Sequence, residues 1–170
     1  MLDRDGVVNE PLEGFVLDYD RDFRFVPAFE ESVRPFVQSA VPLFVLSNQS
    51  SVARELISCR CAEAIMHRMV EDLDRRGIPI GGYVICPHGP QSECECRKPK
   101  PGMLLECERS FGVDLGASAF VGDSQSDLIA GRSAGCLTFC VDAADERAYR
   151  AAFLEAYAAV FKPGSHDQAV

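Results

Sequence analysis

The feature that most restricts the possible folds is a series of short apolar segments that alternate with helical patterns. Residues 41–46 (VPLFVL) are apolar throughout and rich in β-branched and aromatic side chains, which is typical of a strand buried on both faces. Residues 82–86, 119–121 and 137–141 form shorter runs of the same kind, and a further strand is expected to end at Asp3. Strands that alternate with helices predict an α/β fold with a doubly wound parallel β-sheet.

Helices are expected between these segments, where apolar residues recur every three or four positions. They are predicted over residues 28–40, 52–76, 103–111, 127–135 and 145–161. Gly77 is expected to close the longest helix, and Pro35 to strain the first one or end it early. Residues 10–28 show no such period and predict an irregular flap or a short strand pair, while the polar tail 162–170 is expected to be disordered.

Composition and charge exclude several classes of protein. The 170 residues are 47% hydrophobic and 25% charged, which predicts one globular domain over residues 1–170. No apolar run approaches the roughly 18 residues of a membrane span, and no secretory leader is recognisable. We therefore expect a cytoplasmic monomer with mostly reduced cysteines and no membrane partner. The net charge of −9 argues against a nucleic-acid partner, because nucleic acids are bound by basic surfaces.

Two aspartates separated by one residue stand at the start of the chain, in MLDRDGVVN. Only Met1 and Leu2 precede them, so the first strand is expected to be short. Alternate residues of a strand point the same way, so Asp3 and Asp5 are expected to aim two carboxylates at one place, and Gly6 allows a sharp turn. Such a pair is unfavourable unless a cation lies between the carboxylates or one is protonated. It suits a metal-bound nucleophile and a general acid, although two solvated acids would have the same spacing.

Two more polar clusters follow predicted strands. Ser47-Asn48-Gln49-Ser50 comes directly after residues 41–46, where hydroxyl and backbone N–H groups hold an anion or simply cap the next helix. Asp123 and Asp127 follow the strand 119–121 in the sequence GDSQSD. Ligands of doubly wound sheets bind at the carboxyl ends of the strands. We therefore expect these clusters and the aspartate pair to converge on one site.

Four candidate zinc ligands lie close together in the segment 86–96: Cys86, His88, Cys94 and Cys96. This segment contains prolines and a glycine and has no means of building its own core. A Zn²⁺ ion with tetrahedral sulfur and nitrogen ligands would fold it, and four protein ligands leave no open position, so a structural rather than a catalytic zinc is predicted. A disulfide or redox function is the alternative, which the cytoplasmic expectation disfavours.

Positive charge is concentrated in one loop, Arg97-Lys98-Pro99-Lys100-Pro101-Gly102, directly after the last of these ligands. An acidic protein that handles phosphate needs such a local concentration. The prolines stiffen the loop and a metal ion would fix its base, so Arg97 and Lys98 are expected to face an anion. A solvated basic loop is the alternative interpretation.

Together these residues give the chain a resemblance to the haloacid dehalogenase (HAD) superfamily of phosphatases. LDRDGVVN, LSNQS, RKPKPG and VGDSQSD are similar to its four motifs, and the resemblance runs from Leu2 to about Val141. Within the superfamily, CPH…CEC followed by RKPKPGM resembles the D-glycero-D-manno-heptose-1,7-bisphosphate 7-phosphatases. The short interval between the first two motifs leaves no room for a large cap. The resemblance thus implies a HAD-like fold with an inserted zinc loop and an open site for a small phosphorylated sugar.

The resemblance implies a role for each motif residue. Asp3 would be the nucleophile that forms an aspartyl-phosphate, and Asp5 the general acid and base. Ser47 and Lys98 would hold the phosphoryl oxygens. Mg²⁺ would bind Asp3, the backbone carbonyl of Asp5, and Asp123. The residues expected to contact substrate are Asn48, Gln49, Arg97, Gly14 and Ser124.

Some positions depart from the family pattern. Ser47 replaces a threonine but keeps the hydroxyl, Ser51 and Glu55 occupy glycine positions, and Ser124 replaces a lysine that contacts substrate. Asp127 is expected to orient Lys98 or a metal-bound water rather than to bind the metal ion.

Three functions follow as hypotheses. The expected one is removal of the 7-phosphate from D-glycero-D-manno-heptose 1,7-bisphosphate. The loss of lysine at position 124 leaves histidinol phosphate, or another small phosphorylated metabolite, as the alternative substrate. A non-catalytic scaffold built on a degenerate phosphatase is the third hypothesis, which the presence of Asp3, Asp5 and Asp123 opposes.

Overall fold

The computed structural model describes residues 1–161, and the predicted disorder of the tail lies outside the described residues. Its centre is one parallel sheet of five strands in the order β3-β2-β1-β4-β5. The strands are β1 (Leu2–Asp3), β2 (Leu43–Asn48), β3 (Ile80–Cys86), β4 (Ala119–Gly122) and β5 (Leu137–Cys140). The strand order reverses at β1, so this strand lies at the switch point where doubly wound sheets bind ligands. The predicted fold class is confirmed.

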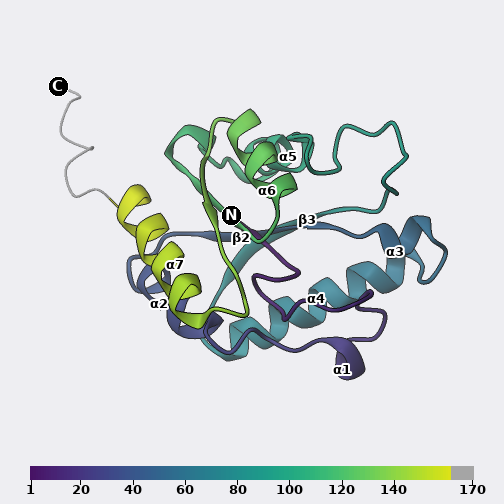
Figure 1. Ribbon diagram of the computed structural model, residues 1–170, viewed down its shortest axis with the longest axis horizontal. Coiled ribbons are helices and arrows are strands. Elements are labelled where there is room, and N and C mark those ends of the chain that lie inside the picture. Colours follow the sequence, from purple (N-terminus) through teal and green to yellow (C-terminus); the bar gives the residue numbers. More distant parts are fainter. Residues whose placement is uncertain (162–170) are drawn as a thin grey trace.

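Helices cover both faces of the sheet (Figure 1). On one face lie α2 (Phe29–Gln38), α4 (Cys59–Arg75) and α7 (Glu146–Val160). On the other lie α5 (Gly102–Phe111) and α6 (Gln125–Ser133). Three short helical segments complete the described chain: α1 (Tyr19–Asp22), α3 (Ser50–Ala53) and η1 (Leu115–Ala117). None of the helices within residues 1–161 is long and apolar enough to cross a membrane.

The alternation of side chains along β2 explains why its first four residues, 43–46, are all apolar. Leu43 and Val45 join the core under α2, α4 and α7, whereas Phe44 and Leu46 join the core under α5 and α6. Successive residues of a strand point to opposite faces. Residues 43–46 therefore all face a hydrophobic core, and the polar Ser47 and Asn48 form the carboxyl end of the strand.

The predicted single helix over residues 52–76 is wrong in its first part. Helix α3 ends at Ala53, and Glu55 has a φ of 57°, a left-handed conformation that cannot continue a right-handed helix. Ser58 then caps α4, because its side chain accepts a hydrogen bond from the Cys61 backbone N–H. Of the two outcomes expected at Pro35, strain or an early end, the early end is wrong, since α2 continues through this residue and proline removes only one backbone hydrogen bond.

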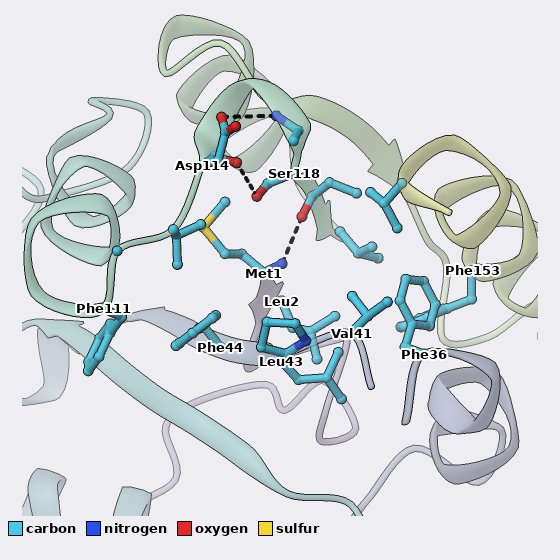
Figure 2. Close-up of a pocket in the computed structure, with 17 residues that line it drawn as sticks. Met1, Leu2, Phe36, Val41, Leu43, Phe44, Phe111, Asp114, Ser118 and Phe153 are labelled. Carbon is cyan, nitrogen blue, oxygen red and sulfur yellow. Dashed lines mark hydrogen bonds between the residues drawn. The ribbon is translucent and has the colours of Figure 1, made fainter. Parts of the chain in front are cut away.

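A cavity lies at the amino end of the sheet, beside the first strand (Figure 2). Strand β1 has 2 residues and β2 has 6, and beside Met1 lies a cavity of about 260 Å³. Its walls include Leu43, Phe44 and Phe153. The terminal ammonium of Met1 donates a hydrogen bond of 2.7 Å to the Ala119 carbonyl, and burial lowers the pKa of this ammonium to about 6. The cavity lies at the opposite end of the strands from the predicted site.

Candidate active site

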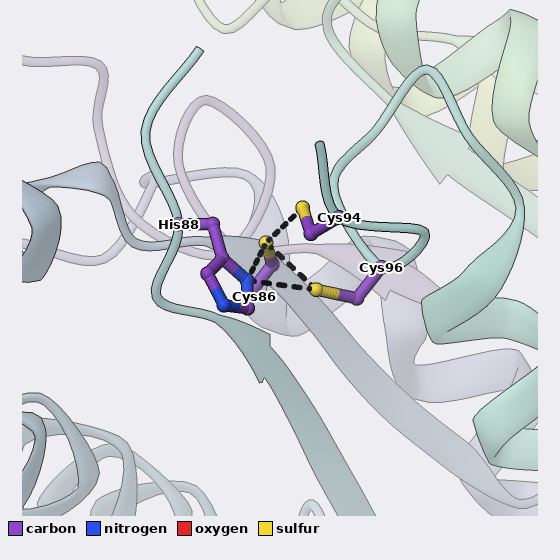
Figure 3. A group of neighbouring side chains, drawn as sticks. All are labelled: Cys86, His88, Cys94 and Cys96. Carbon is purple, nitrogen blue, oxygen red and sulfur yellow. Dashed lines mark hydrogen bonds between the residues drawn. The ribbon is translucent and has the colours of Figure 1, made fainter. Parts of the chain in front are cut away.

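The four predicted zinc ligands converge at the end of β3 (Figure 3). The sulfur of Cys86 lies 3.9 Å from that of Cys94 and 3.1 Å from that of Cys96, and Nδ1 of His88 lies 3.6 Å from the Cys86 sulfur. Zinc–sulfur bonds of about 2.3 Å in a tetrahedron separate two sulfurs by about 3.8 Å, which matches the distance between Cys86 and Cys94, whereas the sulfurs of Cys86 and Cys96 lie closer together. All eight cysteines are free in this structure, and the disulfide or redox alternative stays untested.

Backbone hydrogen bonds attach this cysteine cluster to the elements beside it. The Gln49 backbone N–H donates to the Cys86 carbonyl at 2.7 Å, and that of Gly102 donates to the Glu95 carbonyl at 3.2 Å. Glycine is required at position 102, because a Cβ there would lie 2.2 Å from the Glu95 carbonyl oxygen. Arg97, which is half-buried, donates from Nη1 to the His88 carbonyl at 3.1 Å. The cluster and the basic loop therefore form one connected unit.

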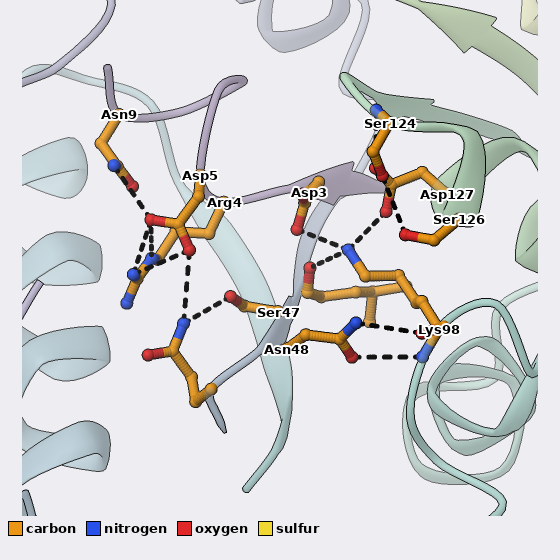
Figure 4. A network of polar contacts seen from close by, with 12 residues as sticks. Asp3, Arg4, Asp5, Asn9, Ser47, Asn48, Lys98, Ser124, Ser126 and Asp127 are labelled. Carbon is orange, nitrogen blue, oxygen red and sulfur yellow. Dashed lines mark hydrogen bonds and ion pairs between the residues drawn. The ribbon is translucent and has the colours of Figure 1, made fainter. Parts of the chain in front are cut away.

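Lys98 reaches from this unit to two buried acids (Figure 4). Its Nζ lies 2.6 Å from Asp3 Oδ1 and 2.5 Å from Asp127 Oδ1. Burial alone would lower the pKa of Lys98, but the attraction of these two carboxylates raises the pKa above its ordinary value. The ammonium group is therefore charged and contacts Asp127. The expectation that Asp127 orients Lys98 or a metal-bound water stays a prediction.

A third acid, Asp123, completes an acidic cluster at the carboxyl ends of β1 and β4. Ligand oxygens of Asp3, Asp123 and Asp127 lie within 4.8 Å of one another. Burial raises the pKa of Asp3 to about 7. The attraction of Lys98 lowers this pKa in part, and the repulsion from Asp127 and Asp5 raises it further. Although Asp123 is exposed as a residue, burial of its carboxyl group and the repulsion of Asp127 raise the pKa of Asp123 to about 6. Three carboxylates face one ammonium, an excess of negative charge that a divalent cation would neutralise.

Two glycines allow these acids to approach. Gly6 has a φ of 77°, and a Cβ there would lie 1.9 Å from Asp123 Oδ2. A Cβ on Gly122 would lie 2.2 Å from the Cβ of Asp127. Only glycine at positions 6 and 122 therefore allows Asp123 and Asp127 to keep their positions.

The side chain of Asp5 is not part of the acidic cluster. It is held instead by Arg4, whose Nη2 donates to Oδ1 at 2.6 Å and to Oδ2 at 2.9 Å. Asn9 Nδ2 also donates to Oδ1, at 3.1 Å. The predicted use of the Asp5 backbone carbonyl as a metal ligand stays a prediction. Arg4 and Asn9 were not predicted as site residues, and their signal was their position inside the first motif.

The polar residues that end β2 divide between two tasks. The amide of Asn48 pairs with the main chain of Lys98: Nδ2 donates to the carbonyl at 3.2 Å, and Oδ1 accepts from the N–H at 3.1 Å. Gln49 Nε2 donates to Ser47 Oγ at 2.7 Å, and both of these residues are buried. Because Ser47 Oγ accepts this hydrogen bond, its own hydrogen is free to be donated to an anion.

The two remaining predicted substrate contacts lie in different surroundings. Gly14 is in the exposed loop before α1, with open space around its Cα. Ser124 forms a capping box with Asp127, in which the Ser124 backbone N–H donates to Asp127 Oδ2 at 3.1 Å. Ser124 thus holds an acid that contacts Lys98. Substrate contacts of both residues stay predictions.

Comparison with known proteins finds relatives along most of the chain. A HAD-hydrolase-like family model matches residues 95–160. The D-glycero-beta-D-manno-heptose-1,7-bisphosphate 7-phosphatase of Pseudomonas aeruginosa is 39% identical over 136 residues, which are 80% of this chain and 76% of that protein. The protein of the same name from Bordetella bronchiseptica is 36% identical over 147 residues, which are 86% of this chain and 82% of that protein.

A solved structure shows the same similarity in three dimensions. The D,D-heptose 1,7-bisphosphate phosphatase of B. bronchiseptica, in complex with magnesium and phosphate, matches with a TM-score of 0.75 and 37% identity. The match covers 82% of this chain and 77% of that one. These similarities confirm the resemblance drawn from the four sequence motifs.

Proposed function

Since this chain belongs to the family of D-glycero-β-D-manno-heptose-1,7-bisphosphate 7-phosphatases, within the HAD-like hydrolases, we propose that this phosphatase depends on Mg²⁺ and removes the 7-phosphate of a heptose 1,7-bisphosphate. One observation carries the proposal. Asp3 is buried at the carboxyl end of the central strand, with Lys98 Nζ at 2.6 Å and Asp123 within ligand distance of the same site.

The reaction proceeds in two steps. A carboxylate oxygen of Asp3 bonds to phosphorus while the bond from phosphorus to the sugar oxygen breaks, and that oxygen takes a proton from Asp5. A water oxygen then bonds to phosphorus, the bond from phosphorus to Asp3 breaks, and Asp5 takes a proton from the water. Lys98 and Ser47 hold the phosphoryl oxygens, where negative charge lies. Asp127 positions Lys98 for this purpose.

The acidic cluster fits a magnesium ion. Asp3, Asp123 and the backbone carbonyl of Asp5 would hold it, since Mg²⁺ prefers oxygen ligands and keeps several waters. The support is the excess of carboxylates over the single ammonium and the raised pKa values of Asp3 and Asp123. When bound, the ion would reduce the repulsion between the attacking carboxylate and the anionic phosphate.

The cysteine cluster fits a structural zinc ion. Three thiol groups and an imidazole, from Cys86, Cys94, Cys96 and His88, fill all four positions of a tetrahedron. The Arg97 guanidinium donates to the His88 carbonyl, so a zinc ion that folds the loop would also fix the position of Arg97. Arg97 directly precedes Lys98 in the sequence and would therefore lie close to the substrate. Its planar fork suits a second phosphate group on the sugar.

The substrate is the least constrained part of the proposal. Ser124 stands where the family has a lysine, which leaves histidinol phosphate or another small phosphorylated metabolite as the alternative substrate.

A scaffold without activity is opposed by the intact acidic cluster and by the Lys98 ion pairs. A cytoplasmic location also stays a prediction. A monomeric state and the absence of a nucleic-acid partner stay predictions.

Phosphate release tests the proposal. The Mg²⁺-loaded protein is assayed with both anomers of D-glycero-D-manno-heptose 1,7-bisphosphate and with histidinol phosphate, alongside Asp3→Asn. Selective turnover of one heptose anomer is expected, and it would show that a lysine at position 124 is dispensable. Preference for histidinol phosphate would overturn the assignment of heptose bisphosphate as the substrate. If folded, metal-loaded protein hydrolyses no phosphate ester, the assignment of phosphatase activity is overturned.

A further inference from the structure

Arg4, between the two aspartates of the first motif, is a buried arginine whose side-chain hydrogen bonds within residues 1–161 all go to one carboxylate. Only 1% of the residue is exposed. Its Nε and Nη2 donate to Asp5 at distances between 2.6 and 3.2 Å, and its Nη1 has no partner within residues 1–161. The Asp5 side chain, by contrast, is 42% exposed. A buried cation is thus dedicated to an acid that reaches solvent.

A purely structural role explains this pair poorly. Arg4 and Asp5 are neighbours in sequence, so their ion pair joins no distant parts of the fold. The turn that contains them is closed by the backbone, since the Arg4 carbonyl accepts hydrogen bonds from the N–H groups of Val7, Val8 and Asn9. Burying a guanidinium also has a desolvation cost, which a half-exposed partner offsets only in part. The pair therefore calls for a functional explanation.

The hydrogen bonds of Asp5 distinguish its two oxygens. Oδ1 accepts from Arg4 Nη2 at 2.6 Å, from Arg4 Nε at 3.2 Å and from Asn9 Nδ2 at 3.1 Å. Oδ2 accepts from Arg4 Nη2 at 2.9 Å and has only a long contact of 3.5 Å with Gln49 Nε2. Oδ1 is saturated, whereas Oδ2 has room for another partner.

We propose that Arg4 is a positioning residue that holds the Asp5 carboxylate with Oδ2 directed outward as the atom that exchanges the proton. This inference rests on the proposed function, in which Asp5 protonates the leaving oxygen. A proton on Oδ2 leaves the three hydrogen bonds to Oδ1 in place, so the carboxyl group keeps its orientation in both steps. Without the planar fork of Arg4, the Asp5 side chain is free to rotate away from the leaving group.

A pair of aryl phosphates tests this role without depending on the natural substrate. p-Nitrophenolate leaves without a proton, whereas the more basic phenolate of phenyl phosphate needs one. Arg4→Met should lower kcat for phenyl phosphate at least about tenfold more than kcat for p-nitrophenyl phosphate, because general acid catalysis contributes roughly 10²- to 10⁴-fold. Asp5→Asn should show the same selectivity, and adding Arg4→Met to it should have no further effect.

Equal losses on the two esters, or no loss on either, would overturn the positioning role. Arg4→Lys keeps the charge without the fork and is the second variant if Arg4→Met does not fold; a selectivity equal to that of the wild type would then refute the inference. If the wild type hydrolyses the aryl esters but not heptose bisphosphate, only the assignment of the substrate is overturned. Failure of the folded, Mg²⁺-loaded wild type on every phosphate ester tested, the two aryl esters included, would overturn the proposed function and this inference together.

Discussion

The acidic cluster and the cysteine cluster are built in opposite ways. Asp3 and Lys98 are separated by 95 positions in the sequence, and only the parallel sheet brings them together. The four residues of the cysteine cluster come from the single segment 86–96. Asp3, Lys98 and Asp127 are buried, whereas only Cys86 is buried among the candidate zinc ligands. The first cluster is thus maintained by the fold, whereas the second would depend on the proposed zinc ion.

This difference makes the two clusters vulnerable to different changes. Substitutions in the acidic cluster should remove chemistry and leave the surrounding core intact. Changes in the cysteine cluster should loosen a loop and affect chemistry only through the residues attached to it. Asn48 joins the two regions, because its amide pairs with the main chain of Lys98.

The largest effect is expected from Asp3→Asn. The substitution removes the proposed nucleophile and hardly changes its volume, so kcat should fall roughly 10³-fold or more. The thermal midpoint should stay within about 4 °C of the wild type, because the core around β1 is unchanged and Lys98 keeps Asp127 as a partner. Phosphate release and thermal unfolding measure the two effects.

Asp74→Asn, on the exposed face of α4, is the matched control for Asp3→Asn and should leave both quantities unchanged. Turnover of Asp3→Asn close to that of the wild type would refute the nucleophile. A cooperative loss of the fold would instead contradict the view that the sheet maintains this cluster.

Removal of zinc should have the next largest effect. Zinc-depleted protein, or Cys94→Ser, should lose activity about 10-fold to 100-fold, the range seen when groups that support a metal site are removed. The loop 86–96 should become sensitive to protease while the rest of the chain stays resistant, since the sheet does not depend on it. Metal analysis, phosphate release and limited proteolysis measure these outcomes.

Cys59→Ser is the control for the cysteine cluster, because Cys59 is an exposed thiol on α4 outside it. This variant should keep the zinc and the activity. Full activity in protein shown to be free of zinc would break the proposed link between the loop and Lys98.

A smaller effect is expected where the two regions meet. Asn48→Ala removes two hydrogen bonds to the main chain of Lys98, each worth about 1 kcal/mol. The activity should fall about tenfold, because Lys98 loses support for its position, while the zinc content stays that of the wild type. Loss of zinc from Asn48→Ala would show instead that the acidic side also stabilises the cysteine cluster, and would weaken the comparison.

The two clusters also differed in how far the sequence could predict them. The spacing of Cys86, His88, Cys94 and Cys96 is local, so their convergence follows from sequence alone and is confirmed. The meeting of Asp3, Lys98 and Asp123 required the correct parallel fold, which the apolar segments indicated. The bonding of Asp5 to Arg4 and of Asn48 to the Lys98 main chain could not be predicted, because both depend on side-chain rotamers inside the turns. The break before α4 was missed because Ile57 continues the apolar period through it.

That break provides the smallest predicted effect, at a residue outside both clusters. Glu55 has a φ of 57°, where a side chain costs roughly 1–2 kcal/mol relative to the right-handed region. Glu55→Gly removes this strain but adds freedom to the unfolded chain, so the net gain in stability should be about 0.5–1 kcal/mol, or roughly 1–4 °C in thermal midpoint. Arg54→Gly, at a φ of −88°, is the matched control and should destabilise the protein. Catalytic activity should be unchanged in Glu55→Gly; a lower thermal midpoint would show that Glu55 makes a contact that outweighs the strain, and a lower activity would extend the acidic site to the break before α4.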